Sequence, residues 1–368
     1  MPRVLAVAPA LPPDVYPQQQ ISDAIVPLLA PDGPRRRLAH RVHAASGVDT
    51  RHLALPIDEY AGLTSFGDAN GHFVRVGTDL AEQACRAALA DAGTAPEEVD
   101  LVLFTSVTGI AAPSLDAALV HRLGLRPDVR RLPSFGLGCA GGAAGLAHLH
   151  EYLVGRPRQV ALLVSVELCS LTFQRDDTST ANLVSSGLFG DGASAVVVGG
   201  DRARAVRDPG PATASRPAPH VVGTRSHLYP GTGDALGWDV RDTGFGIVLS
   251  PELPRLLGAH LAGDVKDLLA PHGLTPDDVA TWVVHAGGPK VVDAVRDALD
   301  LPEAAVARTR ATLAAEGNLS SSSVLHVLAA TLADGEPGPG EWAVLMAFGP
   351  GVAAELVLLR GDREAVGP

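Results

Sequence analysis

The chain has 368 residues, 46% of them hydrophobic, and its 29 Lys and Arg against 41 Asp and Glu give a net charge of −12. This length and apolar content suit one large domain or two medium ones with a sizeable core, and the acidic balance argues against a nucleic-acid-binding surface. Three cysteines cannot form a disulfide framework, no Cys and His spacing indicates a metal site, and no apolar run approaches the roughly 18 residues of a membrane span. Because the chain begins without a signal-peptide layout, we expect a cytoplasmic protein.

The first predicted elements carry little chemistry. The basic run Arg35-Arg36-Arg37 is interpreted as a solvated helix face. A helix is predicted over residues 79–92, with Cys85 on its apolar face, where a cysteine is usually buried and unreactive. Gly93 then ends the helix, and a turn and a strand follow.

This helix–turn–strand pattern belongs to an internal duplication. Three pairs of segments match in the same order along the chain: GTAPEEVDLVLF (93–104) with GLTPDDVATWVV (273–284), Gly138-Cys139 with Gly317-Asn318, and FGDGASAVVV (189–198) with FGPGVAAELV (348–357). They predict two similar α/β halves, residues 1–205 and 220–368, each a sheet covered by helices. The Pro-rich stretch 207–220 is predicted to connect them, and the first half to hold an insertion between roughly 166 and 188.

The segment around Cys139 is the most informative. A short strand leads into GLGCAGG, and a helix follows. Gly136, Gly138 and Gly141 fit the GxGxxG pattern of dinucleotide-binding proteins, with Glu167 as the ribose acid, so an NAD-dependent oxidoreductase is the alternative from another class. That motif usually opens its domain, however, and it does not account for the cysteine.

A nucleophilic cysteine accounts for more. A Cys at a helix start faces free backbone N–H groups and the positive end of the helix dipole, which lower its pKa and favour the thiolate. His285 ends the strand TWVVH, where functional side chains gather in α/β sheets, and a thiolate needs such a partner. Asn318 begins a helix and, as the duplicate of Cys139, is predicted to converge with it on one pocket. Cys169, just after a strand, is interpreted as buried.

Several segments together carry a family resemblance: FGLGCAGG around Cys139, LFGDGA (188–193), HAGGPK (285–290), GNLSSSSV (317–324) and FGPG (348–351). With them, the chain resembles the type III polyketide synthases of the thiolase superfamily. The resemblance implies an α/β, thiolase-like fold of two duplicated halves with a layered αβαβα architecture. It also implies an acyltransferase of secondary metabolism that condenses CoA thioesters without a metal or redox cofactor.

The resemblance further implies roles for individual residues. Cys139 would carry the acyl chain, and His285 would hold it as the thiolate. His285 and Asn318 would donate hydrogen bonds to the thioester oxygen. The substrate cavity would be lined by a gatekeeper and five further residues: Phe189, Val107, Trp238, Ile247, Ser320 and Pro350. CoA would be bound by the backbone of two glycines and by one cation on its phosphates: Gly287, Gly288 and Arg51.

Other segments resemble one group within that family, the bacterial 1,3,6,8-tetrahydroxynaphthalene synthases: TRHLALPIDEYAGL (50–63), TSVTGIAAPSLDA (105–117) and VELCSLTFQRD (166–176). That group builds a pentaketide from malonyl-CoA alone. Trp238 would remove cavity volume and so disfavour bulky aromatic starters. A synthase making a pyrone or resorcinol from another acyl-CoA, and an enzyme like ketoacyl-ACP synthase III, are the alternatives within the superfamily. The resemblance also implies a homodimer in which residues 108–116 reach the partner's cavity.

Overall fold

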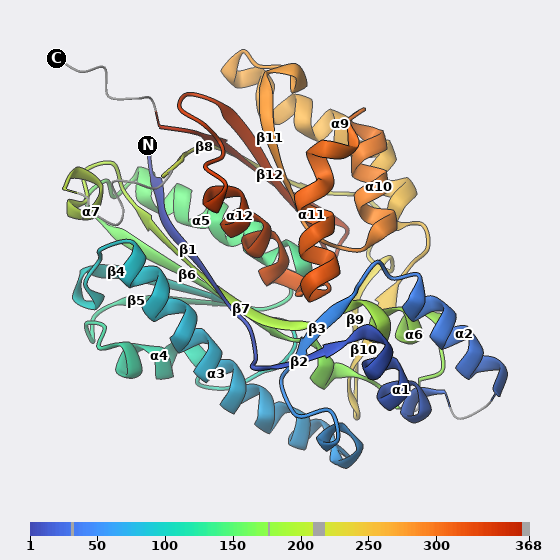
Figure 1. Ribbon diagram of the computed structural model, residues 1–368. Coiled ribbons are helices and arrows are strands. Elements are labelled where there is room, and N and C mark those ends of the chain that lie inside the picture. The colour runs from blue at the N-terminus through green and yellow to red at the C-terminus, as the bar shows by residue number, and fades with distance from the viewer. Residues whose placement is uncertain (31–32, 176, 209–217, 363–368) are drawn as a thin grey trace.

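A computed structural model describes residues 1–30, 33–175, 177–208 and 218–362, so residues 209–217 of the predicted connection lie outside it. Nine strands form one sheet in the order β11-β12-β13-β8-β1-β7-β6-β4-β5 (Figure 1). The first half of the chain supplies five of them: β1 (Arg3–Ala10), β4 (Val99–Thr105), β5 (Arg130–Ser134), β6 (Val160–Leu168) and β7 (Asp191–Gly199). The second half supplies four: β8 (His220–Leu228), β11 (Val279–Val284), β12 (Trp342–Gly349) and β13 (Ala353–Arg360).

The sheet is made of two half-sheets that meet at one seam. β1 and β8 pair only through Arg3 and His220, whereas every other neighbouring pair has a longer register. On either side of the seam the strands run in matching order, so the halves are similar in topology as well as in sequence.

Three helical layers separate and cover the half-sheets. The central layer contains α5 (Gly141–Val154) and α12 (Ser323–Ala333), and the outer layers contain α3 (Phe66–Asp91) with α4 (Leu115–Leu123) and α9 (Leu253–Leu269) with α10 (Pro289–Ala298) (Figure 1). Each layer has its own apolar cluster. The strand alternation of β4 shows why: Leu101 and Leu103 belong to the central cluster, Val102 and Phe104 to an outer one. The predicted αβαβα layering is confirmed.

Other elements surround these layers. The remaining helices are α1 (Gln18–Leu29), α2 (Gly33–Ala44), α6 (Thr180–Leu188), α7 (Arg204–Arg207) and α11 (Glu303–Glu316). Two antiparallel strand pairs lie outside the large sheet: β2 (Asp14–Pro17) with β3 (Thr50–Leu53), which α1 and α2 separate in the chain, and the hairpin of β9 (Leu236–Arg241) with β10 (Gly244–Leu249). Among the described helices, none is long and apolar enough to span a membrane.

The duplicated segments fold alike. Gly93 and Gly273 both have left-handed φ values, 59° and 70°, and each is followed by a 3-10 turn and a strand. The helix predicted over residues 79–92 is the C-terminal part of the longer α3, whose N-cap Ser65 accepts a hydrogen bond from Asp68 N. The predicted insertion contains α6, between β6 and β7, whereas a short turn joins β12 to β13.

Candidate active site

Cys139 lies in a 3-10 turn, Gly138–Ala140, that leads directly into α5. Gly138 has φ +53°, and a Cβ there would overlap the ring of Pro350, so this position favours glycine on both counts. Cys139 is half-buried as a residue, and its thiol donates a hydrogen bond to Ser320 Oγ at 3.6 Å. The turn thus presents the cysteine toward the second half of the chain, with Pro350 packed beneath it.

A matching turn opens α12. Ser320–Ser322 forms a 3-10 turn, and Ser320 has φ +49°, nearly the value of Gly138. The predicted convergence of the two helix starts is confirmed by the Cys139–Ser320 contact. The predicted register is wrong, because Ser320 matches Gly138 in backbone conformation and Ser321, not Asn318, therefore takes the place of Cys139.

Asn318 is held by a set of hydrogen bonds just before this turn. Its Oδ1 accepts from Ser320 N at 2.8 Å and from Ser323 Oγ at 3.2 Å, and its Nδ2 donates to Gly287 O at 3.3 Å. Its backbone forms a bridge with Phe189. A side-chain amide has two N–H bonds, and the carbonyl of Gly287 uses one of them, so the second can serve the Cys139 sulfur, whose pKa Asn318 acts to lower.

His285 follows β11 directly and is 2% exposed. Its backbone N donates to Met346 O on the parallel strand β12, and the end of β12 packs under the cysteine turn, since a Cβ on Gly349 would meet the backbone of Leu137. Among the described residues, Nδ1 of His285 has no hydrogen-bond partner. Gly287 lies two residues on, and Gly288, with φ +129°, caps α10.

Burial favours the neutral forms of both Cys139 and His285. Burial raises the pKa of Cys139 to about 12, against hydrogen bonds from Ser320 and Asn318 that act to lower it. Burial lowers the pKa of His285 to about 3. The prediction that the helix start lowers the thiol pKa is therefore wrong: α5 proper begins only at Gly141, and desolvation outweighs the helix dipole.

The other cysteines are buried, as predicted. Cys85 and Cys169 are 0% and 2% exposed, and burial raises the pKa of both thiols. Cys139, by contrast, is only half-buried as a residue.

The predicted cavity residues lie on three elements near the cysteine. Phe189 follows α6, and Trp238 and Ile247 are cross-strand partners in the β9–β10 hairpin. Phe189 and Ile247 belong to the central apolar cluster, against which Cys139 and Trp238 pack. Val107 is buried and donates its backbone N–H to Glu167.

Glu167 is a buried site residue that the sequence did not identify in this role. Its carboxylate accepts hydrogen bonds from Val107 N at 3.1 Å, from Thr108 Oγ1 at 2.8 Å and from Ser321 Oγ. Burial raises its pKa. It thereby ties the cavity wall to the turn of the second half, which leaves no free carboxylate for a ribose and argues against the dinucleotide alternative. A lone acid at the end of the apolar strand VALLVSVEL was the available signal.

Arg51 does not lie where CoA phosphates could reach it, so its predicted role is wrong. It is 0% exposed, because it shares the inward face of β3 with Leu53. Its Nη1 donates to the carbonyls of Ser186 and Phe189 at 2.8 and 2.7 Å, and its Nε donates to Gln18. Burial lowers its pKa to about 10. Arg51 supports the backbone of Phe189 from inside the protein.

The part of the chain that the structure describes contains no group of side chains suited to bind a metal ion. No three His, Cys, Asp or Glu side chains gather there in a way that could hold a metal ion.

Comparisons with known proteins agree with one another. The models for the N-terminal and C-terminal domains of chalcone and stilbene synthases match residues 2–202 and 220–362. A 1,3,6,8-tetrahydroxynaphthalene synthase from Streptomyces peucetius subsp. caesius is 52% identical over 97% of this chain and 92% of that protein, and one from Streptomyces griseus is 36% identical over 91% and 86%. The crystal structure of the Streptomyces coelicolor A3(2) synthase of the same name, a bacterial type III polyketide synthase, superposes with a TM-score of 0.90 at 31% identity, covering 98% of this chain and 99% of that one.

Proposed function

The chain belongs to the chalcone and stilbene synthase family, the type III polyketide synthases, and from this premise we propose that it makes 1,3,6,8-tetrahydroxynaphthalene from malonyl-CoA alone. It is an acyltransferase that condenses CoA thioesters. One observation carries the choice of product: the 52% identity to a tetrahydroxynaphthalene synthase extends over nearly the whole of both chains.

Cys139 is the proposed acyl carrier. Its thiol attacks the thioester carbonyl of the starter, and neutral His285 accepts the thiol proton as the carbon–sulfur bond forms. The bond to CoA then breaks, and the CoA thiolate takes that proton and leaves as the free thiol. Because burial raises the pKa of Cys139 and lowers that of His285, the ion pair exists only when a bound substrate draws the thiol into reaction.

His285 and Asn318 are the proposed donors for chain extension. Loss of CO₂ from a malonyl extender leaves an enolate, whose oxygen accepts N–H hydrogen bonds from the imidazole and from the second N–H of the amide. Such a donor in a dry site is typically worth about 3–4 kcal/mol in the transition state. The enolate carbon then attacks the acyl thioester, and the Cys139 thiolate is released while the chain, two carbons longer, stays on CoA.

The cavity walls support a small starter. Trp238 and Ile247 present bulk from neighbouring strands, beside the cluster that contains Phe189. Such a wall favours malonyl or another short acyl group over an aromatic one. Gly287 and Gly288 lie beside Asn318, where backbone can approach the CoA thioester.

The test is incubation of the purified protein with malonyl-CoA as sole substrate, followed by mass spectrometry. We expect tetrahydroxynaphthalene or its oxidised quinone as the main product. A triketide or tetraketide pyrone as the main product would replace the pentaketide proposal with the second candidate, and no turnover without another acyl-CoA would refute the starter assignment.

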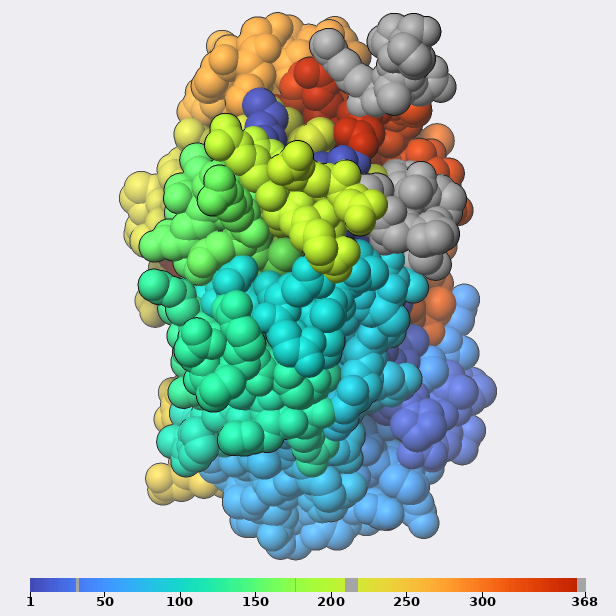
Figure 2. Space-filling model, turned by 90° about the vertical axis from the view of Figure 1, so that its left-hand side faces the viewer, coloured from blue at the N-terminus to red at the C-terminus, as the bar shows by residue number. Residues whose placement is uncertain are grey.

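A homodimer is the proposed assembly. β5 lies at the edge of the sheet, and Figure 2 turns this side of the molecule to the viewer. Ile110, Leu132 and Phe135 on and beside this edge are each about half exposed. Exposed apolar side chains next to an open strand edge favour association with another surface, and residues 108–116, which include Ile110, lie beside this edge.

Light scattering tests the dimer. At micromolar concentration it should give twice the chain mass, and Ile110→Asp should shift the protein toward monomer; a monomeric wild type would refute the dimer.

A further inference from the structure

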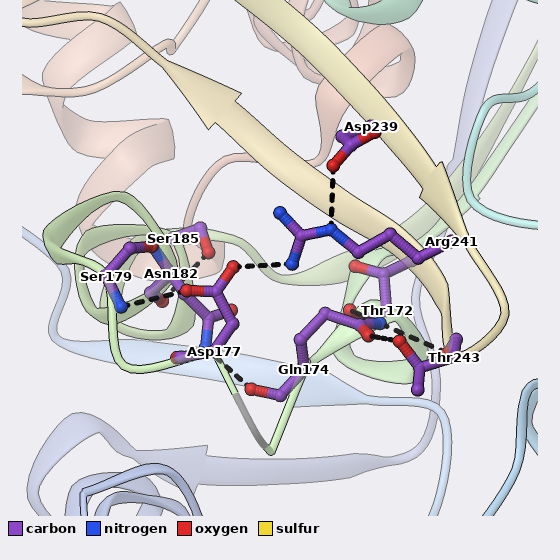
Figure 3. Close-up of polar contacts among 9 residues, drawn as sticks. All are labelled: Thr172, Gln174, Asp177, Ser179, Asn182, Ser185, Asp239, Arg241 and Thr243. Atoms are coloured by element: carbon purple, nitrogen blue, oxygen red, sulfur yellow. Dashed lines mark hydrogen bonds and ion pairs between the residues drawn. The ribbon is translucent and has the colours of Figure 1, made fainter.

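Polar side chains fasten the turn of the β9–β10 hairpin to the segment before α6 (Figure 3). Arg241 Nη1 pairs with Asp177 Oδ2 at 2.9 Å, and Thr243 Oγ1 donates to Gln174 Oε1 at 2.6 Å. These contacts join two elements that are far apart in the sequence. They hold the hairpin at its turn, which is the end opposite its base at Ser250.

The segment before α6, which contains Gln174 and Asp177, is itself held by hydrogen bonds from residues of its own half. Asn182 is 2% exposed, and its Nδ2 donates to the backbone carbonyls of Gln174 and Asp177, both at 2.7 Å. Ser179 N donates to the other carboxylate oxygen, Asp177 Oδ1, at 2.8 Å. The acceptor for Arg241 is therefore also held by hydrogen bonds that do not involve Arg241 (Figure 3).

The ion pair stands between two hollows. An inner cavity of about 430 Å³ is walled on one side by apolar residues of α1 and α3, and an open groove of about 690 Å³ runs past Ile247. Asp177 and Arg241 line both hollows. The turn is also held by Phe245, which is 5% exposed and packs edge-on against Phe66 with ring centroids 5.3 Å apart, so the polar contacts supplement an apolar one.

We propose that the Asp177–Arg241 ion pair, with the Gln174–Thr243 hydrogen bond, is a latch that determines starter specificity. This inference rests on the proposed function, in which Trp238 and Ile247 of the same hairpin border the acyl chain on Cys139. Closed, the latch keeps the hairpin against that chain and favours the malonyl starter. Released, it joins the groove to the inner cavity and admits a long saturated acyl chain along the apolar wall that α1 and α3 form there.

The latch is exposed enough to be weak. The Arg241 side chain is 40% exposed and that of Asp177 is 11%, and salt screens ion pairs that solvent can reach. The choice of starter should therefore depend on ionic strength even in the wild-type protein.

A competition assay tests the latch. Equal concentrations of malonyl-CoA and dodecanoyl-CoA are offered with the full chain, and the ratio of dodecanoyl-primed to malonyl-primed products is measured by mass spectrometry. Asp177→Asn and Arg241→Gln should each raise this ratio about tenfold, the size of discrimination that one pocket contact supplies. Arg241→Lys, which keeps the charge, should stay near the wild-type ratio.

Asp239→Asn is the matched control. Asp239 also pairs with Arg241, through Nε at 2.8 Å, but it lies on the hairpin itself and joins nothing across the latch. Its ratio should equal that of the wild type. An equal rise in this control, or no rise in either latch variant, would overturn the proposal.

Salt provides the measurement that needs no variant. The wild-type ratio should rise between roughly 0.05 and 1 M NaCl, and a constant ratio would count against the latch if a variant failed to fold. Failure of the proposed function gives a different result: the wild type would then make no malonyl-primed product at any salt concentration.

Discussion

The two turns that begin α5 and α12 share a backbone but not a chemistry. Both are 3-10 turns that open with a left-handed residue, Gly138 at φ +53° and Ser320 at φ +49°. In the first half that residue is a glycine and the next is Cys139. In the second half both are serines, and Asn318 stands two residues before the left-handed one.

The two turns differ in the backbone strain of their left-handed residue. Glycine adopts a positive φ at almost no cost, whereas serine does not. Ser320 is held by Asn318 Oδ1, which accepts its N–H at 2.8 Å, and it accepts the thiol hydrogen bond of Cys139. One half therefore provides a freely adopted turn for a nucleophile, and the other a strained turn whose support is the proposed donor of the reaction.

Removing the nucleophile of the first turn should have the largest effect on activity. Cys139→Ala should lower condensation of malonyl-CoA at least about a thousandfold, because no acyl-enzyme can form. Product formation is measured by mass spectrometry. Cys85→Ala, a buried thiol in α3, is the control and should keep the wild-type rate. Near-normal elongation by Cys139→Ala would refute the covalent mechanism.

Replacing Asn318 tests the second turn. Asn318→Ala should lower the decarboxylation rate of malonyl-CoA by about 10²–10³, the usual effect of losing one such donor. CO₂ release gives the rate. Asn318→Asp keeps the shape but places a negative charge beside the enolate, so it should be no better than alanine. Full activity in the aspartate variant would show that the amide donates nothing to the reaction.

Gly138→Ala tests whether the first turn needs its glycine. A Cβ would overlap the ring of Pro350, and alanine at φ +53° is strained, so we expect a loss of about 1–3 kcal/mol in stability. Thermal unfolding measures it, and kcat should fall with the displaced cysteine. Gly124→Ala is the control, since φ there is also positive, at +74°, but a Cβ would meet open space; an equal loss in both variants would assign the effect to φ alone.

Sequence patterns predicted two α/β halves, and the family resemblance predicted their layers, but the register of the site was wrong and the roles of its residues stay predictions. Gly138-Cys139 and Gly317-Asn318 look alike in sequence, and the true match, Gly138 with Ser320, has no shared residue type. The left-handed Ser320 was not foreseen because only its hydrogen bond to Asn318 is local, whereas its contact with Cys139 exists only in the folded chain. The role predicted for Arg51 was wrong for a related reason. Arginine is usually exposed, and the only sign that Arg51 is buried was that it shares a strand face with Leu53. The cysteine pKa failed because burial, which decides it, is a property of the whole fold.

Ser320→Ala gives the smallest expected effect and links the two turns. The hydrogen bond from Ser320 acts to lower the pKa of Cys139, so its loss should raise that pKa further above the value of about 12 that burial sets. Less thiolate is then present at every pH below the pKa. Alkylation by iodoacetamide should therefore slow by a few-fold, which is about the effect of losing one hydrogen bond. In both proteins the rate should climb as pH rises from about 6 to 9, because the thiolate is the reacting form. Peptide mapping at Cys139 gives the rates, with Ser323→Ala as the control: the Ser323 hydroxyl bonds Asn318 Oδ1 at 3.2 Å, whereas the Ser320 hydroxyl bonds the sulfur itself. A rate independent of pH, or the same in wild type and Ser320→Ala, would mean that the second turn does not tune the nucleophile of the first.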